Sequence, residues 1–332
     1  SGGADLSVAA PLAEGRLRLS GGFYQGEVGA PGDIDPSSWS LSDDARQESG
    51  RQHASLAYQS DRFLSDLFTF DSALNYRRES LNFSSSDSEH VLHTVGLDLG
   101  QEFYAGNTVS LVYGGSLQYD TAESTEIGDQ NRTGLAGYLQ VPVFFTESLE
   151  LIPALRFDYA SDFDPALTYR ISALYTPQSD LSFKLSGGSS YRAPSFNDLY
   201  WPNDGFSQGN PDLKPERGYF GEFGLTHMTD RTLINAYLFT RYVEDEIQWT
   251  ETSPWFYEPL NIGESLYPGL EIDGELRLTE AISLSGSYTF LYSYLLKDSS
   301  ADYTLQDDLR VAYTPLHSAD ARVAYSTNTT SA

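Results

Sequence analysis

Residues 282–296 read Ile-Ser-Leu-Ser-Gly-Ser-Tyr-Thr-Phe-Leu-Tyr-Ser-Tyr-Leu-Leu. Nearly every even-numbered position is apolar or aromatic, and most odd-numbered positions are serine or threonine. Successive side chains of a β-strand point to opposite faces, so this alternation predicts a strand with one apolar and one polar face. The strand is longer than the usual five or six residues, and a strand tilted across a bilayer needs only about 9–11.

The same two-residue period recurs along the chain, clearly so at 109–120 and 149–159. A soluble β-sandwich also alternates, but its strands are shorter. The pattern predicts about 16 strands, at 4–11, 16–28, 51–60, 64–83, 90–104, 108–121, 133–145, 149–160, 165–177, 181–192, 219–228, 232–243, 269–278, 282–296, 309–314 and 319–326.

The connections between these segments alternate in length. Tight turns are predicted at 13–15, 146–148, 178–180, 229–231 and 279–281, and longer loops at 29–50, 84–89, 122–132, 193–218, 244–268 and 297–308. Short turns on one rim and long loops on the other are typical of barrels that cross a membrane with strands. The sequence therefore predicts an all-β fold, an antiparallel up-and-down transmembrane β-barrel.

Composition excludes other classes of protein. The chain has no run of about 18 apolar residues, which a transmembrane helix would need. Lys and Arg number 20 against 47 Asp and Glu, a net charge of −27 that argues against nucleic-acid binding. Cysteine is absent, which rules out disulfides and thiolate metal sites.

The predicted loops are acidic. The carboxylates gather in two of them: Asp33, Asp35, Asp43 and Asp44 in the first, and Glu244, Asp245, Glu246 and Glu251 in another. Solvated loops explain such clusters, and a divalent cation bound by their oxygens is the alternative. Because no spaced Asp-x-Asp-x-Asp-Gly pattern occurs, we expect no metal site and no cofactor.

Two short motifs are more specific than the alternation. Residues 190–200 read Ser-Tyr-Arg-Ala-Pro-Ser-Phe-Asn-Asp-Leu-Tyr, and residues 209–216 read Gly-Asn-Pro-Asp-Leu-Lys-Pro-Glu. They resemble the paired boxes of TonB-dependent receptors, one ending a strand and the other opening the next. The box residues are Tyr191, Arg192, Ala193 and Pro194, then Asn210, Pro211, Asp212, Leu213, Pro215 and Glu216.

The residues of the boxes suit a structural role. Proline cannot donate a ladder hydrogen bond, so Pro194, Pro211 and Pro215 end strand pairing at the rim. Arg192 and Glu216 are predicted to pair across the base of the loop between the boxes. Residues 261–263, 269–272 and 315–317 also resemble junctions of the same family.

The resemblance implies a receptor in the bacterial outer membrane that takes up a scarce, bulky nutrient with energy from TonB. Family barrels have 22 strands and enclose a plug domain. We therefore expect residues 1–332 to be a partial barrel domain, about 16 of 22 strands, without the plug and the final strands. The implied partners are a siderophore or cobalamin ligand, the TonB complex through the plug, and outer-membrane lipid. We expect a monomer.

Several functions stay open at this stage. Haem uptake is disfavoured because no histidine lies between Pro194 and Asn210. A passive porin is the main alternative, and no catalytic set stands out, so we expect no enzyme. The predicted ligand-binding residues are polar or aromatic residues of long loops: Tyr200, Trp201, Asn203, Phe206, Trp255, Phe256 and Tyr257. The alternative is that they pack the loops together or lie in an aromatic girdle.

Overall fold

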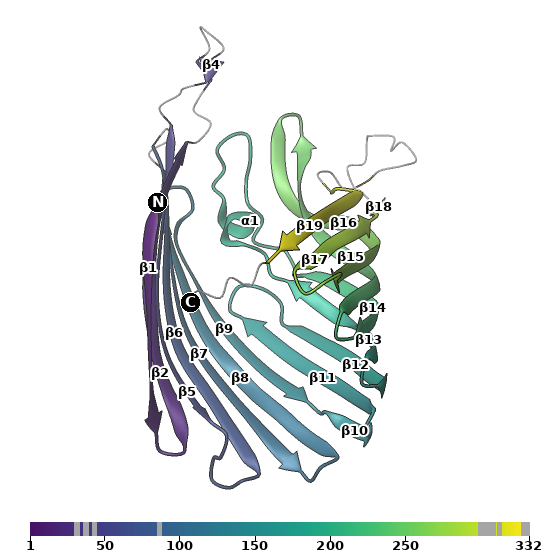
Figure 1. Cartoon of the computed structure of the whole chain (residues 1–332). Helices are drawn as coiled ribbons and strands as arrows, with labels where there is room; N and C mark the ends of the chain where they lie inside the picture. The colour runs from purple at the N-terminus through teal and green to yellow at the C-terminus, as the bar shows by residue number, and fades with distance from the viewer. Residues whose placement is uncertain are drawn as a thin grey trace, which may run out of the picture.

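The computed structural model describes residues 1–29, 34–35, 40–41, 45–84, 88–297, 310 and 314–326. These residues form one curved antiparallel sheet of 17 strands, a separate pair of very short strands and a five-residue helix (Figure 1). The all-β, antiparallel prediction is confirmed. The described part of the chain has no helix with the length and hydropathy of a membrane span.

Most strands are far longer than those of soluble domains. In chain order they are β1 (Gly2–Leu12), β2 (Gly15–Gly29), β3 (Ile34–Asp35), β4 (Ser40–Leu41), β5 (Arg46–Ser60), β6 (Phe68–Phe83), β7 (Ser88–Ala105), β8 (Val109–Ser124), β9 (Gly128–Gln140), β10 (Val143–Thr146), β11 (Leu149–Ala160), β12 (Ala166–Gln178), β13 (Leu181–Arg192), β14 (Glu216–Met228), β15 (Thr232–Ser253), β16 (Phe256–Arg277), β17 (Ile282–Leu291), β18 (Tyr294–Lys297) and β19 (His317–Tyr325). The helix α1 (Phe196–Tyr200) lies between β13 and β14.

The sheet has the meander order that the sequence predicts. Each long strand pairs with the one before and the one after it, as β5 does with β2 and β6. The short strand β10 lies between β8 and β11. Among the described strands, β1 pairs only with β2, and β19 pairs only with β17.

Two predicted loops are largely strand. Only residues 125–127 separate β8 from β9, where the sequence predicts a loop at 122–132. The predicted loop 244–268 is instead the end of a hairpin, because β15 and β16 pair up to Ser253 and Phe256. These strand ends carry polar residues on both faces, so no apolar alternation marks them. The long connections and the hairpin tip still gather at one rim (top in Figure 1), opposite the tight turns.

Two predicted strands are each interrupted at a proline. The segment 133–145 divides into β9 and β10 at Pro142. The segment 282–296 divides into β17 and β18 opposite Pro268. The carbonyl oxygen of Pro268 accepts from the N–H of Tyr292, but proline has no N–H to donate in the ladder. The segment 64–83 becomes regular only at Phe68. Of the predicted strand 309–314, only residues 310 and 314 are among the described residues.

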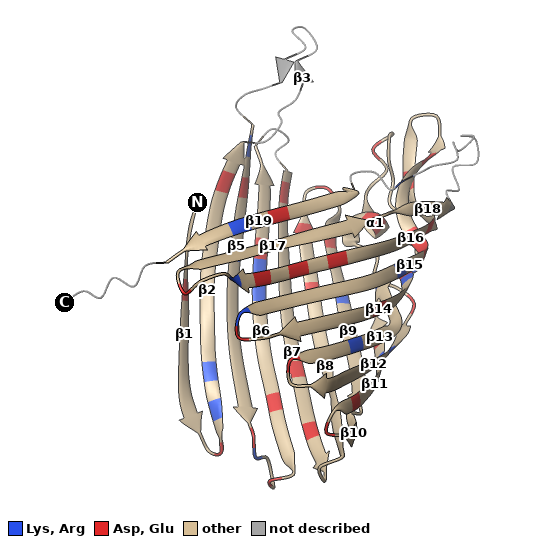
Figure 2. Ribbon diagram, turned by 45° about the vertical axis from the view of Figure 1, so that its right-hand side comes forward, with Lys and Arg blue, Asp and Glu red and all other residues tan. Residues whose placement is uncertain are grey.

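The two faces of the sheet differ in chemistry. On the concave face, Ser55 donates to Asn75, whose amide donates to Asp98 on the next strand. The opposite, convex face carries a row of exposed leucines, with Leu97 and Leu135 flanking Leu117 in register. Asp and Glu outnumber Lys and Arg along the strands (Figure 2), as the net charge requires.

Strand β17 follows this division. Ser287 donates to Asp320 of β19 and lies in register with Asp273 of β16, on the concave face. Tyr288 lies in register with Ile272 on the convex face. The side chains of β17 that share the inward face with Ser287 are therefore Ser283, Ser285 and Thr289, and those that share the outward face with Tyr288 are Ile282, Leu284 and Phe290.

Close strand packing around one glycine gives a testable consequence. A Cβ at Gly188 would collide with the carbonyl oxygen of Tyr169 and lie 2.9 Å from the Cα of Arg170, both backbone atoms. We expect Gly188→Ala to lower the free energy of unfolding by about 1–3 kcal/mol. Gly137→Ala is the control, because its Cβ would lie 3.9 Å from the nearest atom. Denaturant midpoints of the full-length protein in detergent would measure both, and equal midpoints would contradict the packing argument.

Candidate functional site

Helix α1 begins at the first box and is fixed by its own cap. The Ser195 hydroxyl accepts from the backbone N–H of Asp198 (3.1 Å), and the Asp198 carboxylate accepts from the backbone N–H of Ser195 (3.0 Å). This reciprocal capping box satisfies two helix-end donors at once and holds a helix of only five residues. Leu199 is buried against Leu213 of the second box and Ile247 of β15.

The Asp198 carboxylate also reaches the hairpin. The second carboxylate oxygen of Asp198 accepts from the indole N–H of Trp249 in β15 (3.0 Å). The carboxylate is almost fully buried, and its bonds to the cap and the indole leave neither oxygen without a donor. Asp198 therefore joins the first box to the wall formed by β15 and β16.

The two boxes meet at an ion pair. Arg192, the last residue of β13, donates to the carboxylate of Glu216, the first residue of β14, in the pairing predicted from the sequence. The same carboxylate accepts from the backbone N–H of Ile247 (2.8 Å). Glu216 is 6% exposed, so water competes little with these bonds, and the base of the inter-box loop is fixed.

Arg132 of β9 ties a third segment to the first box. Its guanidinium makes two bonds to Asp162 (2.7 and 2.8 Å) and one to the carbonyl oxygen of Pro194 (3.0 Å). It also lies 5.0 Å from the ring centre of Phe163 and 4.7 Å from that of Phe196, within cation–π range. One side chain therefore joins β9, the turn after β11 and helix α1.

The loop after α1 is organised by an exposed carboxylate. Asp204 accepts from the backbone N–H groups of Phe206 (2.8 Å) and Ser207 (2.6 Å) and from the indole N–H of Trp201 (3.2 Å). These bonds favour the charged form and lower the pKa of Asp204 to about 2. The charged carboxylate thus holds the loop in a turn.

This loop is joined to the hairpin tip. Ser207 forms a parallel bridge with Tyr257, and Tyr257 donates its N–H to the carbonyl oxygen of Phe206 (2.8 Å). Phe206 is 69% exposed and Trp255, with a positive φ of 66°, is 78% exposed. Together the loop 201–209 and the hairpin tip 253–257 form one surface with exposed aromatic rings, which we call the rim platform.

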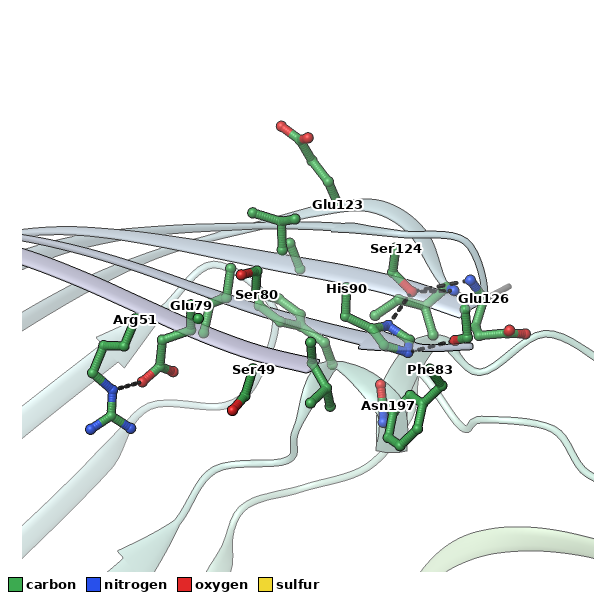
Figure 3. Close-up of a pocket in the computed structure, with 18 of the residues that line it drawn as sticks. Ser49, Arg51, Glu79, Ser80, Phe83, His90, Glu123, Ser124, Glu126 and Asn197 are labelled. Carbon is green, nitrogen blue, oxygen red and sulfur yellow. Dashed lines mark hydrogen bonds and ion pairs between the residues drawn. The ribbon is translucent and has the colours of Figure 1, made fainter. Parts of the chain in front are cut away.

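A cavity of about 880 Å³ lies between α1 and the concave ends of β5–β8 (Figure 3). Arg51 points to Glu79 at one end, with their charged groups 2.9 Å apart. His90 lies beside Ser124 at the other end, at 2.8 Å, and Asn197 of α1 comes from the facing side. The cavity therefore combines an ion pair, an imidazole and apolar wall.

All the predicted ligand-binding residues except Tyr200 lie on the rim platform, but they differ in exposure and contacts. Phe206, Trp255 and Tyr257 are exposed on the rim platform, where Phe256 is half-buried. Asn203 bonds to Gln208 within the loop (3.0 Å), Trp201 lines the cavity, and Tyr200 packs against the buried cluster around Leu199. Their role in ligand binding remains a prediction.

The box residues serve the framework. Pro194, Leu213, Pro215 and Glu216 are buried; Ala193, Asn210 and Tyr191 are partly buried; Pro211, Asp212 and Arg192 are exposed. Asn210 accepts from the N–H of Asp212 (3.0 Å) and donates to Pro259 (3.1 Å).

Sequence reasoning missed Arg132, Asp198, Trp249 and Asp204. The Ser-x-x-Asp spacing of a capping box was a signal for Asp198. Arg132 and Trp249 had none, because the partners of Arg132 lie 30 and 62 positions away in the chain and the partner of Trp249 lies 51 positions away.

The described residues bring no three His, Cys, Asp or Glu side chains together in a cluster suited to a metal ion. The first predicted acidic cluster, Asp33, Asp35, Asp43 and Asp44, has no side chain among those that the structure describes. Glu244, Asp245, Glu246 and Glu251 lie within β15 and not on a loop.

Comparison with known proteins agrees with this geometry. A family model described as TonB dependent receptor-like, beta-barrel matches residues 7–331. The chain belongs to the TonB-dependent receptor family. Members of this family are outer-membrane proteins, and the relatives found are transporters and receptors rather than enzymes.

Among curated relatives, the chain is 31% identical over 154 residues to the vitamin B12 transporter BtuB of Vibrio vulnificus strain YJ016. That match covers 46% of this chain and 24% of the transporter. The BtuB of Photobacterium profundum is 25% identical over 269 residues, 77% of this chain and 42% of that protein. The chain thus spans less than half the length of these relatives.

Solved structures share the fold. The FrpB iron transporter of Neisseria meningitidis (F3-3 variant) superposes with a TM-score of 0.78 at 14% identity, over 99% of this chain and 57% of that one. The copper transporter OprC gives a TM-score of 0.77 at 16% identity, over 98% and 55%. At such identities the likeness concerns the fold alone.

Removing the guanidinium of Arg132 should loosen the first box. Arg132→Met leaves Asp162, whose side chain is 9% exposed, without its cation. We expect the local unfolding free energy of residues 193–209 to fall by about 2–4 kcal/mol, measured by hydrogen exchange. Arg51→Met is the control: its pair with Glu79 is largely exposed and contributes within about 1 kcal/mol. Unchanged hydrogen exchange of residues 193–209 in Arg132→Met would show that Arg132 does not hold the first box in place.

The loop around Asp204 should respond to acid. The carboxyl has an ordinary pKa of 3.8 when unfolded and a folded pKa of about 2, so its contribution is complete above pH 3.8 and is lost as the pH falls through about 2. Fluorine NMR of fluorotryptophan-labelled protein should show the Trp201 resonance move in that window. Asp204→Asn should abolish the transition, and the resonance is assigned by its loss in Trp201→Phe. A transition near pH 4 would contradict the lowered pKa.

Proposed function

We propose that the full-length protein is a monomeric outer-membrane receptor that captures a scarce, bulky nutrient and takes it up with energy supplied through TonB. Family membership supports this class of function. The observation that carries it is the rim platform, which presents exposed aromatic rings of Phe206, Trp255 and Tyr257 above a polar interior. Aromatic rings in a fixed frame bind a large, partly apolar ligand at little ordering cost.

Cobalamin is the first ligand that we propose, with a ferric siderophore second. The curated relatives at 25–31% identity carry vitamin B12, according to their names. The siderophore proposal has support from fold neighbours that include siderophore receptors, such as PirA of Pseudomonas aeruginosa at 16% identity. We propose no cofactor and no enzymatic activity.

The apolar convex face suits a lipid environment. Lipid offers no hydrogen-bond partner, and the bonded polar groups of Ser55, Asn75 and Asp98 are directed inward. A passive porin would share this wall. It would not need an aromatic platform at the rim, nor two boxes held by buried carboxylates.

Uptake of labelled cobalamin by cells that express the full-length protein should require TonB. A ligand held tightly by a large surface dissociates slowly, so inward release needs work that diffusion does not supply. Transport should be saturable in the parent strain and fall to background in a strain that lacks TonB, with ferric siderophores tested in parallel.

Measuring how much ligand binds to the cells distinguishes capture of the ligand from its transport. Trp255→Ala with Phe206→Ala should weaken ligand binding about tenfold, equivalent to about 1.4 kcal/mol, with and without TonB. Leu64→Ala is the matched control, since this residue is 89% exposed at the opposite rim. Equal uptake in both strains, or ion conductance without saturable binding, would favour the porin.

A further inference from the structure

One connection at the rim with the tight turns differs from its neighbours. Residues 61–67, between β5 and β6, are the longest connection among the described strands at that rim, which is the lower one in Figure 1. The turns on either side of it, at 13–14 and 106–108, carry small or polar residues. The connection 61–67 instead carries Leu64 and Leu67, which are 89% and 50% exposed. Two large apolar side chains are thus exposed between polar turns.

The connection folds against the convex face of the sheet. The ring of Phe63 stacks on the ring of Phe70 in β6, with the ring centres 4.7 Å apart. Phe70 is four positions from Leu74 on the same strand, so both side chains point to the same face. Leu74 lies in register with Leu97 of the convex leucine row. The residue before Leu64 is therefore packed on the lipid-facing side and not in the lumen.

Aromatic rings form a belt on this part of the convex face. Phe68 of β6 and Phe103 of β7 lie in register, and their rings stack with centres 4.8 Å apart. Tyr58 of β5 lies 6.4 Å from Phe70 by ring centres. In membrane barrels such rings collect where the hydrocarbon meets the lipid headgroups. The connection 61–67 therefore continues the convex wall beyond its aromatic edge.

The backbone of the connection is ordered, and it holds one residue under strain. The N–H of Phe63 donates to the carbonyl oxygen of Phe68 (2.8 Å), and the N–H of Tyr104 in β7 donates to that of Leu67 (2.9 Å). Within this frame Leu64 has a φ of 65°. Glycine adopts this left-handed conformation freely, whereas leucine adopts it at a cost in energy. An exposed leucine in a strained, well-ordered loop points to a function for its side chain.

We propose that the connection 61–67 is a membrane anchor, in which Leu64 and Leu67 lie among the acyl chains of the lipid leaflet at the tight-turn rim. Acyl chains remove the two exposed leucines from water, which is favourable. The occupant is lipid because the convex wall and its aromatic belt continue into the connection. The ion pair of Arg62 with Asp66 is largely exposed and belongs in the headgroup layer. The inference rests on the proposed outer-membrane location.

Spin labels on single cysteines of the full-length protein test the anchor in vesicles of phosphatidylethanolamine and phosphatidylglycerol. Oxygen concentrates among acyl chains and a nickel chelate stays in water, so the accessibility of a label to each reports its depth. We expect the label on Leu64→Cys to favour oxygen, as on Leu74→Cys of the convex wall, and the label on Asn107→Cys to favour the chelate. Residues 1–332 contain no cysteine, and the parent protein taken through the same labelling gives the background.

A second label follows the connection without replacing either leucine. The label on Ser65→Cys should move from the oxygen-accessible to the chelate-accessible range when Leu64→Gln and Leu67→Gln are introduced together. Met228→Gln is the matched control and should not move the label. Met228 is 62% exposed at the same rim, but it lies on the concave face of β14.

Two outcomes would overturn the anchor: a Leu64→Cys label as accessible to the chelate as that on Asn107→Cys, or a Ser65→Cys label that the double glutamine variant does not move. If the label on Leu74→Cys is also in water, the proposed membrane location fails, and the anchor fails with it. The label on the convex wall therefore distinguishes a failure of the location from a failure of the anchor alone.

Discussion

The backbone hydrogen bond between neighbouring strands is the interaction on which the other features depend. A wall that faces hydrocarbon has no water to satisfy N–H and C=O groups, so each strand must pair along its length. The side-chain period is two, and a register slip of one residue would reverse the two faces of a strand. The hydrogen bonds from Ser55 to Asn75 on the concave face and the leucine row around Leu117 on the convex face therefore follow from the same register.

Where the strand pairing of β13 and β14 ends at the rim, hydrogen bonds to buried carboxylates hold the segments together. Asp198 and Glu216 are each 8% exposed or less, and each binds donors from two different segments. Loss of a donor would leave a charge in a poorly solvated place, which costs more than the bond itself contributes. The resemblance of the two boxes to other receptors thus has a physical reason in the contacts of their acidic residues.

Much of this architecture could be predicted from sequence because alternation reports burial on one face. Strand β17 and the pairing of Arg192 with Glu216 are examples. Alternation gives a weak signal where strands rise above the apolar band, as in the hairpin of β15 and β16, since polar residues occur on both faces there. Arg132 was also missed, because its contacts join segments far apart in the chain.

The bridge between Ser207 and Tyr257 has a consequence for the thermodynamics of capture. Loops that close over a ligand lose backbone conformational entropy of about 1–2 kcal/mol for each residue that becomes ordered. Here the turn at Asp204 and the hairpin tip are already ordered by their hydrogen bonds in the folded protein. A ligand bound there as proposed would meet Phe206 and Trp255 on backbone that is already ordered, so its capture would cost little further backbone entropy.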